Sequence, residues 1–224
     1  MQLNDNFDFA GYVSRFNGKG RIRLEGALSD ADALNVHQAL ERRTPWELQL
    51  VGAEGQPQAI SRFELEQLPP DVIQSRLQDA AVRAQTGLSY LRLGFDLMAH
   101  SEPALKDISD LLKSEAFARL CEKLTGLSGL VLTQLSAVCY RNGDFFTRHT
   151  DTQARLGFEW SFTQGWRSDW GGQMLFHSPS GDLEGGIMPR MNDLALFAGD
   201  QPRSIASVAP YAAGPRFSIT GRFG

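Results

Sequence analysis

The sequence predicts an α+β protein in which N-terminal helices support a C-terminal β-sandwich or jelly roll. Its 224 residues suffice for one sizeable domain. Residues 66–125 carry apolar side chains at helical spacing, whereas residues 130–224 alternate short apolar runs with turn residues. We therefore expect a single domain over residues 1–224, in which residues 1–129 support a core formed by residues 130–224.

The N-terminal half begins with a predicted strand, helix and strand over residues 20–51. The segment RIRLEG alternates apolar and polar residues, and WELQLV returns as a second extended run. Between them, Ser29 is a suitable N-cap for a helix whose first turn is acidic. Residues 52–56 (GAEGQ) are typical of a turn.

Two helical stretches follow over residues 66–125. The first begins at Pro69-Pro70-Asp71, and the second follows the loop at Ser101-Glu102-Pro103. Both repeat apolar residues at helical spacing, which predicts helices that pack one apolar face on a sheet. The repeated positions are Val72, Leu77, Ala80, Ala81 and Ala84 in the first stretch, and Leu105, Ile108, Leu111, Leu112, Phe117 and Leu120 in the second.

From residue 130 onward the sequence predicts only strands and turns. Many short alternating runs at this spacing are typical of a sandwich or jelly roll. The predicted strands are 131–141, 155–163, 171–178, 193–198, 204–210 and 215–223.

Composition and charge exclude several classes of protein. Hydrophobic residues form 42% and charged residues 21% of the chain, which argues against a disordered or fibrous protein. The net charge of −4 and the absence of a basic stripe argue against nucleic acid as a partner. No window approaches the roughly 18 apolar residues of a membrane span, so no membrane partner is expected.

The N-terminus and the cysteines bear on the compartment. Residues 1–10 have neither the positive start nor the apolar run of a signal peptide. Cys121 and Cys139 lie in apolar contexts without CxxC spacing, which predicts buried thiols and not a disulfide or a zinc site. We therefore expect a cytoplasmic protein, as a monomer or a homodimer.

The strongest chemical signal is His149-Thr150-Asp151. On a strand, two residues two positions apart point to the same side, so both side chains can reach one metal ion. His-x-Asp forms two thirds of the facial triad that holds non-haem iron(II) and leaves coordination positions open. The bare tripeptide occurs commonly on surface turns, so its context decides its meaning.

That context resembles the iron(II)- and 2-oxoglutarate-dependent oxygenases of the prolyl-4-hydroxylase-like type. The resemblance covers residues 130–224 well and residues 20–51 more loosely. It rests on landmarks in the family's order: Tyr140-x-x-Gly143-Asp144-Phe145-Phe146-x-x-His149-x-Asp151, Trp166-x-x-Asp169-Trp170-Gly171-Gly172-x-Met174-x-Phe176, Pro189, Leu196-Phe197, Ser204-Ile205-x-x-Val208 and Arg216-x-Ser218-Ile219-x-Gly221-x-Phe223.

The resemblance implies a double-stranded β-helix (jelly-roll) core and a set of site residues. His149 and Asp151 would be iron ligands. Arg216 and Ser218 would bind the distal carboxylate of 2-oxoglutarate, because a guanidinium forks onto a carboxylate and a hydroxyl on the same face adds a hydrogen bond. Tyr140 would line the pocket. Fe(II) and 2-oxoglutarate would be required, with ascorbate as a further candidate cofactor.

Two departures from the family pattern stand in the same region. The family has a second histidine directly before the Ser-Ile-x-x-Val strand, and this chain has Arg203 there. Arginine stays protonated and cannot serve as an ordinary nitrogen ligand. Ser161-Phe162-Thr163 also stands where the family has Tyr-Leu-Asn.

Four interpretations of Arg203 are open from the sequence. Iron can be held by His149, Asp151, 2-oxoglutarate and water alone. His177 can replace the lost ligand, since His37 and His100 lie in the other half of the chain. Arg203 can fill the site and pair with Asp151. The chain can also be a variant of an active enzyme in which a histidine was replaced.

Two functions from different classes follow. The first is a dioxygenase that hydroxylates a peptidyl (prolyl-like) or small amino-acid-like substrate. Its catalytic centre would contain His149, Asp151 and Arg203, and Arg203 would impair its activity. The second is a catalytically silent jelly-roll module that binds a ligand or partner without iron. A sugar-binding jelly roll that uses the tryptophans would leave the order of His149, Asp151 and Arg216 unexplained.

Overall fold

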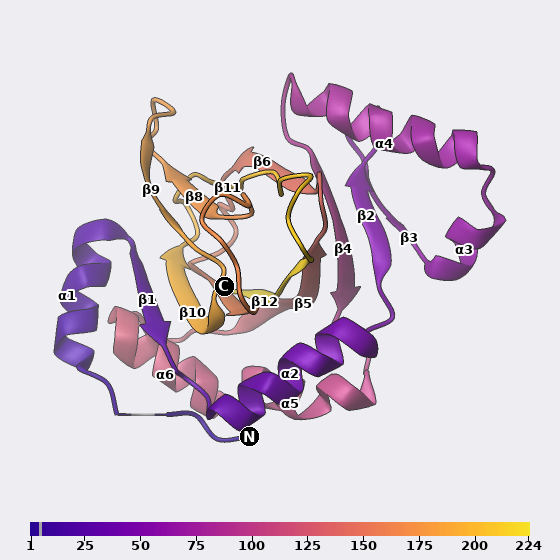
Figure 1. Ribbon diagram of the computed structural model, residues 1–224. Helices are drawn as coiled ribbons and strands as arrows, with labels where there is room; N and C mark the ends of the chain where they lie inside the picture. The colour runs from indigo at the N-terminus through magenta and orange to yellow at the C-terminus, as the bar shows by residue number, and fades with distance from the viewer. Residues whose placement is uncertain (5) are drawn as a thin grey trace.

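The computed structural model describes residues 1–4 and 6–224, and these form a strongly curled sheet packed against several helices (Figure 1). The helices are α1 (Phe9–Lys19), α2 (Asp30–Arg42), α3 (Arg62–Gln67), α4 (Pro70–Ala84), the 3₁₀ turn η1 (Pro103–Leu105), α5 (Lys106–Lys113) and α6 (Glu115–Thr125). The strands are β1 (Arg21–Glu25), β2 (Glu47–Val51), β3 (Pro57–Ile60), β4 (Tyr90–Asp96), β5 (Leu132–Tyr140), β6 (Phe145–His149), β7 (Leu156–Phe162), β8 (Met174–His177), β9 (Leu183–Ile187), β10 (Met191–Ala198), β11 (Arg203–Ile205) and β12 (Arg216–Phe223).

The strands pair antiparallel in the order β1-β10-β7-β12-β5-β4-β6-β11-β8-β9, with β2 and β3 added beside β4. The sheet curls so that β6, β11, β8 and β9 come to face β10, β12 and β5 across an interior (Figure 1). This half-barrel with helices on one face confirms the predicted α+β class and its jelly-roll core.

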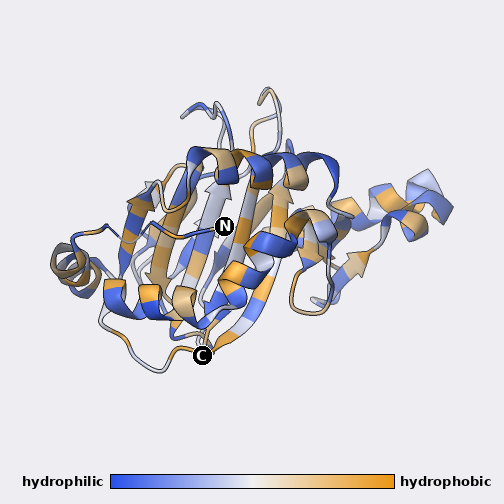
Figure 2. Ribbon diagram, turned by 90° about the horizontal axis from the view of Figure 1, so that it is seen from below, coloured by the Kyte–Doolittle hydropathy of each residue, from blue (hydrophilic) through white to orange (hydrophobic). Residues whose placement is uncertain are grey.

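Helices α1, α2, α5 and α6 cover the outer face of the sheet, whereas α4 packs on β2 and β4 at another side (Figure 1). Figure 2, seen from the helical side, shows them lying across the strands, with hydrophobic and hydrophilic residues alternating along each helix. Phe117 of α6 is fully buried there and packs edge-on against Phe158 of β7. Ser29 caps α2 through a bond from the Asp32 amide, as its position in the sequence predicted.

The residues that shape the interior come from the opposite sides of the same strands. They form an apolar cluster in the interior, separate from the one under the helices. Its members include Val138, Tyr140, Ala195, Phe197, Met174, Phe176, Ile205 and Val208. A third, smaller cluster lies under α4, where Ala80 packs against Leu48, Leu50 and Ile60. The interior cluster forms one wall of the cavity described below.

Several elements differ from the sequence-based expectation. Helix α1 was not predicted, although Phe9, Tyr12, Val13 and Phe16 of its segment stand at helical spacing. Asp8 caps its start, and Gly20 ends it with a φ of 65°. Strands β3, β6 and β9 were not predicted either, and the expectation of helices over residues 66–125 is wrong at β4, which pairs with β2 and β5 in the sheet. The expected strand at 204–210 stops at Ile205, because the following amides bond to loop carbonyls: Ala206 to Gln173 and Val208 to Asp144.

The two cysteines are free and buried, as expected. Burial raises the pKa of the Cys139 thiol to about 12. Within residues 1–4 and 6–224, no helix combines the length and the apolar character that a membrane crossing requires.

Candidate active site

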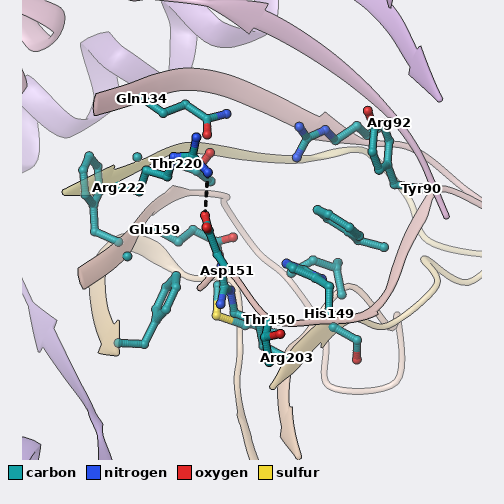
Figure 3. Close-up of a pocket in the computed structure, with 18 of the residues that line it drawn as sticks. Tyr90, Arg92, Gln134, His149, Thr150, Asp151, Glu159, Arg203, Thr220 and Arg222 are labelled. Atoms are coloured by element: carbon teal, nitrogen blue, oxygen red, sulfur yellow. Dashed lines mark hydrogen bonds and ion pairs between the residues drawn. The ribbon is translucent and has the colours of Figure 1, made fainter. Parts of the chain in front are cut away.

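The site residues meet at a cavity of about 400 Å³ inside the curled sheet. Strands β6 and β11 are neighbours, and Arg203 lies directly opposite His149 in their register. Asp151 follows two residues after His149, and Tyr140 reaches the cavity from β5. Figure 3 shows Asp151 near the centre, with His149 and Arg203 beside it.

One ring nitrogen of His149 forms a hydrogen bond that orients the imidazole. Its Nδ1 lies 3.0 Å from the carbonyl oxygen of Thr147, so this nitrogen donates and Nε2 carries the lone pair. The ring also stacks on Phe146 with centroids 3.9 Å apart. Burial, together with the charge of Arg203, lowers the pKa of His149 to about 4. The imidazole is therefore neutral at pH 7, which is the form able to bind a metal.

Asp151 lies beyond the end of β6, so the expected placement of both residues on one strand is wrong. Its Oδ2 accepts a bond of 2.8 Å from Nη1 of Arg222, and its Oδ1 accepts one of 3.2 Å from the Gln153 amide. Partial burial raises the pKa of Asp151, but the bond and charge of Arg222 outweigh it and leave the pKa below its usual value. The carboxylate is thus ionised and already paired.

Arg203 occupies the position where the resemblance implies a third iron ligand. Its Nη1 donates to the carbonyl oxygens of Gly199 at 3.2 Å and Gln201 at 3.3 Å. Its guanidinium lies 4.6 Å from the centroid of the Phe197 ring. A pairing of Arg203 with Asp151 was one of the four open interpretations; in the structure the ion-pair partner of that carboxylate is Arg222.

His177 does not replace the missing ligand. Its Nε2 lies 2.8 Å from the hydroxyl of Ser204, and the residue does not line the cavity. Among the described residues, no three His, Cys, Asp or Glu side chains converge as a metal site. His149 and Asp151 alone do not fit the facial triad that iron(II) requires.

Arg216 and Ser218 are placed on β12, and both are fully buried. Arg216 forms an ion pair with Glu159 of β7, and its guanidinium lies 5.2 Å from the centroid of the Tyr140 ring. Arg216 Nε, Arg216 Nη1 and Ser218 Oγ have no hydrogen-bond partner among the described residues. Arg216 therefore already has a carboxylate partner, and that partner belongs to the protein.

Sequence reasoning missed Glu159, Arg222 and Arg92. Glu159 is the single acidic residue within the apolar run RLGFEWSFT, and that isolation was the available signal. Arg222 pairs with Asp151, while Arg92 donates to Gln49 at 3.1 Å and lies 5.1 Å from the Tyr90 ring centroid. No sequence pattern connected either arginine with the cavity.

Charge in and around the cavity is predominantly positive. Arg92, Arg203 and Arg222 line it, and Arg216 lies against its wall behind Glu159. Two carboxylates oppose these four cations, those of Asp151 and Glu159. Because His149 is neutral at pH 7, the region favours anionic ligands over cations such as iron(II).

Comparison with known proteins identifies one family profile that matches part of the chain. The profile described as the 2OG-Fe(II) oxygenase superfamily matches residues 135–224. That range contains His149, Asp151, Arg203 and Arg216. A search of curated proteins finds no match.

Solved structures extend the likeness to nearly the whole chain. A prolyl-4-hydroxylase from Pseudomonas putida is 18% identical with a TM-score of 0.58, over 96% of this chain and 97% of that one. A prolyl hydroxylase from Trichoplax adhaerens, in complex with a hypoxia inducible factor peptide, is 17% identical with a TM-score of 0.64, over 96% and 88%.

A third solved structure is an oxidoreductase of the 2OG-Fe(II) oxygenase family from Burkholderia pseudomallei. It is 14% identical with a TM-score of 0.63, over 100% of this chain and 93% of that one. At these identities the likeness concerns the fold. Together with the profile match over residues 135–224, it confirms the resemblance to the prolyl-4-hydroxylase-like members of the 2OG-Fe(II) oxygenase superfamily.

Proposed function

We propose that this chain keeps the fold of a 2OG-Fe(II) oxygenase but, as it stands, is a catalytically silent binding module that holds no iron. The observation that carries this proposal is Arg203, which lies opposite His149 where the third ligand would stand. A permanent cation in that position cannot donate a lone pair to a metal.

Three physical effects act together against iron(II). One ligand is lost, so metal affinity falls. The charge of Arg203 repels a divalent cation within a partly buried cavity, where charges are screened less than in water. Asp151 would also have to leave its ion pair with Arg222 before it could bind a metal through Oδ2.

The ligand class follows from the cavity. Its volume of about 400 Å³ suits a small molecule or a few residues of a peptide. Aromatic rings of Tyr90 and Phe146 line it together with Arg92 and Arg222, which fits a ligand that combines an apolar part with an acidic group. The free, buried thiols are compatible with a cytoplasmic location.

An impaired oxygenase is the second candidate, and one observation favours it. His149 and Asp151 both line the cavity, and the bond from His149 Nδ1 leaves Nε2 available for a metal. In that case the substrate would be a prolyl-like peptide residue or a small amino-acid-like molecule. The peptide-bound prolyl hydroxylase among the similar structures supports this class.

Iron(II) titration under anaerobic conditions separates the two candidates. Wild-type protein should show no stoichiometric binding, whereas Arg203→His should bind iron(II) at least about 100-fold more tightly, since even outer-shell changes cost 10- to 100-fold. Asp151→Ala in the Arg203→His background is the matched control and should lose this gain. Calorimetry gives the stoichiometry and the dissociation constants.

Two outcomes would overturn the proposal. One is wild-type iron binding that equals that of Arg203→His and disappears in Asp151→Ala. The other is succinate formation by the wild-type protein that depends on iron and 2-oxoglutarate. Either result would establish the impaired oxygenase.

A further inference from the structure

A buried ion pair closes the wall of the cavity opposite His149. Glu159 of β7 lines the cavity, whereas its partner Arg216 of β12 is fully buried and does not. Glu159 stands opposite Thr220 in the pairing of β7 with β12, and Thr220 lies four residues after Arg216 on the same face of β12. In Figure 3 Glu159 appears on the cavity wall near Asp151. A molecule in the cavity therefore meets the carboxylate of Glu159 before it can reach Arg216.

We propose that Glu159 is an internal carboxylate that occupies the anion-binding face of Arg216 and thereby excludes 2-oxoglutarate and similar carboxylates from it. The inference concerns the same cavity as the proposed function and deepens it, but it does not involve a metal. It assigns a specificity role to a residue that lies outside the recognised motif.

The unsatisfied donors around Arg216 support this assignment. Only Nη2 of Arg216 bonds to Glu159, while Nε and Nη1 are buried without a partner among the described residues. The hydroxyl of Ser218, on the same face of β12, is buried and unpaired in the same way. A guanidinium offers five N–H donors in a fork that matches a carboxylate. Nε and Nη1 of Arg216 and the hydroxyl of Ser218 are therefore still able to bind a carboxylate, but Glu159 lies between them and the cavity.

Exclusion follows from the cost of displacing Glu159. An incoming carboxylate would have to separate a buried ion pair, which leaves the charge of Glu159 without its partner in a site with little access to water. Glu159 is also tethered to the sheet, so it competes at a high effective concentration. Loss of the Glu159 charge should therefore open the site to free carboxylates.

The test uses metal-free protein in EDTA and three carboxylates: acetate, succinate and 2-oxoglutarate. Wild-type protein should bind none of them at Arg216. Glu159→Ala should bind at least one with a dissociation constant about 10- to 100-fold below the highest concentration at which wild-type protein shows no binding, the range expected for hydrogen bonds to a charged group. Calorimetry measures the affinity. Thermal denaturation, with and without ligand at about 20 times the dissociation constant, reports binding independently, because a bound ligand stabilises the folded state by about RT ln(1 + [L]/Kd).

Matched variants keep the result interpretable. Glu159→Ala/Arg216→Met removes both partners and should lose the gain in carboxylate binding. Glu159→Gln keeps the shape of the side chain and removes its charge, so it should be stabilised by acetate even if Glu159→Ala folds poorly. This stabilisation should again disappear when Arg216 is replaced.

The proposal is wrong if Glu159→Ala and Glu159→Gln respond to carboxylates no more than the double variant does. It is also wrong if wild-type protein binds 2-oxoglutarate without metal and Arg216→Met abolishes that binding, because Arg216 would then already be accessible. Since no metal is present, neither result depends on whether Arg203→His recovers iron binding. Failure of this inference is thus distinguishable from failure of the proposed function.

Discussion

Strands β7 and β12 each have two faces, and the two faces differ in chemistry. The helix-backed face carries Leu156, Phe158, Trp160 and Phe162 of β7 together with Phe217, Ile219 and Phe223 of β12. The cavity face carries Gly157, Glu159 and Ser161 of β7 together with Arg216, Ser218, Thr220 and Arg222 of β12. The period of two along each strand sends alternate residues to opposite sides.

The helix-backed face contributes mainly to stability, whereas the cavity face carries the groups that can bind a ligand. On the helix-backed face, Phe117 of α6 packs against Phe158, Trp160 and Phe223, and no charge has to be buried. On the cavity face, a buried ion pair and three unsatisfied polar atoms are tolerated. The apolar face supports the fold, so the cavity face can exchange its residues for others and change what it binds.

The largest effect is expected from breaking the ion pair of the cavity face. Arg216→Met leaves Glu159 buried without a partner and should lower the free energy of unfolding by about 3–5 kcal/mol. Glu159→Leu/Arg216→Met removes both charges and should recover most of this loss. Urea denaturation at pH 7 measures both. If the double variant loses as much stability as Arg216→Met and Glu159→Leu lose together when made singly, the two residues are not coupled.

A smaller effect is expected where the cavity face is close-packed. A Cβ at Gly157 would lie 2.2 Å from Cε2 of Phe197, whose ring lies under the guanidinium of Arg203. Gly157→Ala should therefore lower the free energy of unfolding by about 1–3 kcal/mol through overpacking. Gly18→Ala in α1 is the matched control, because a Cβ there meets no atom within 4 Å.

The Gly18→Ala control should leave stability unchanged or raise it by about 0.5–1 kcal/mol, since alanine is the better helix former. Thermal denaturation of the two variants side by side makes the comparison. Equal stability of Gly157→Ala and wild type would mean that Phe197 moves aside at no cost, and the close packing of this wall would then be unimportant.

The smallest effect is expected from a conservative change on the helix-backed face. Ile219→Val removes one buried methyl group from β12 and should cost about 0.5–1.5 kcal/mol. In the Glu159→Ala background it should leave carboxylate affinity unchanged, because Ile219 points away from the cavity. A change in that affinity, measured by calorimetry, would show that the two faces are coupled.

The sequence predicted the elements with one strongly apolar face better than the other elements. Apolar spacing was sufficient to predict α2, α4, α5 and α6, and alternation was sufficient for β5, β7, β10 and β12, because both patterns follow from burial on one side. The prediction missed α1, although Phe9, Tyr12, Val13 and Phe16 of this helix stand at helical spacing. It also failed for β6 and β9, which are only partly buried and alternate weakly.

For the site, motif order placed His149, Asp151, Arg203 and Tyr140, and the structure brings all four to one cavity. Their roles as ligands and cofactor contacts stay predictions. The partners of the charged residues were beyond sequence reasoning. Arg222 lies 71 positions from Asp151, and Arg216 lies 57 positions from Glu159.

The sequence by itself thus determined the fold class, the order of the motifs and the presence of an arginine where a ligand histidine is usual. These properties are local, because they depend on spacing along the chain and on the chemistry of single residues. Only the tertiary structure decided which cation neutralises which carboxylate. Pairing across the sheet brings distant residues to one wall of the cavity, and burial there makes each charge require a partner. That requirement links Glu159 to Arg216 and Arg222 to Asp151, whereas Arg203, opposite His149, donates to the backbone carbonyl oxygens of Gly199 and Gln201.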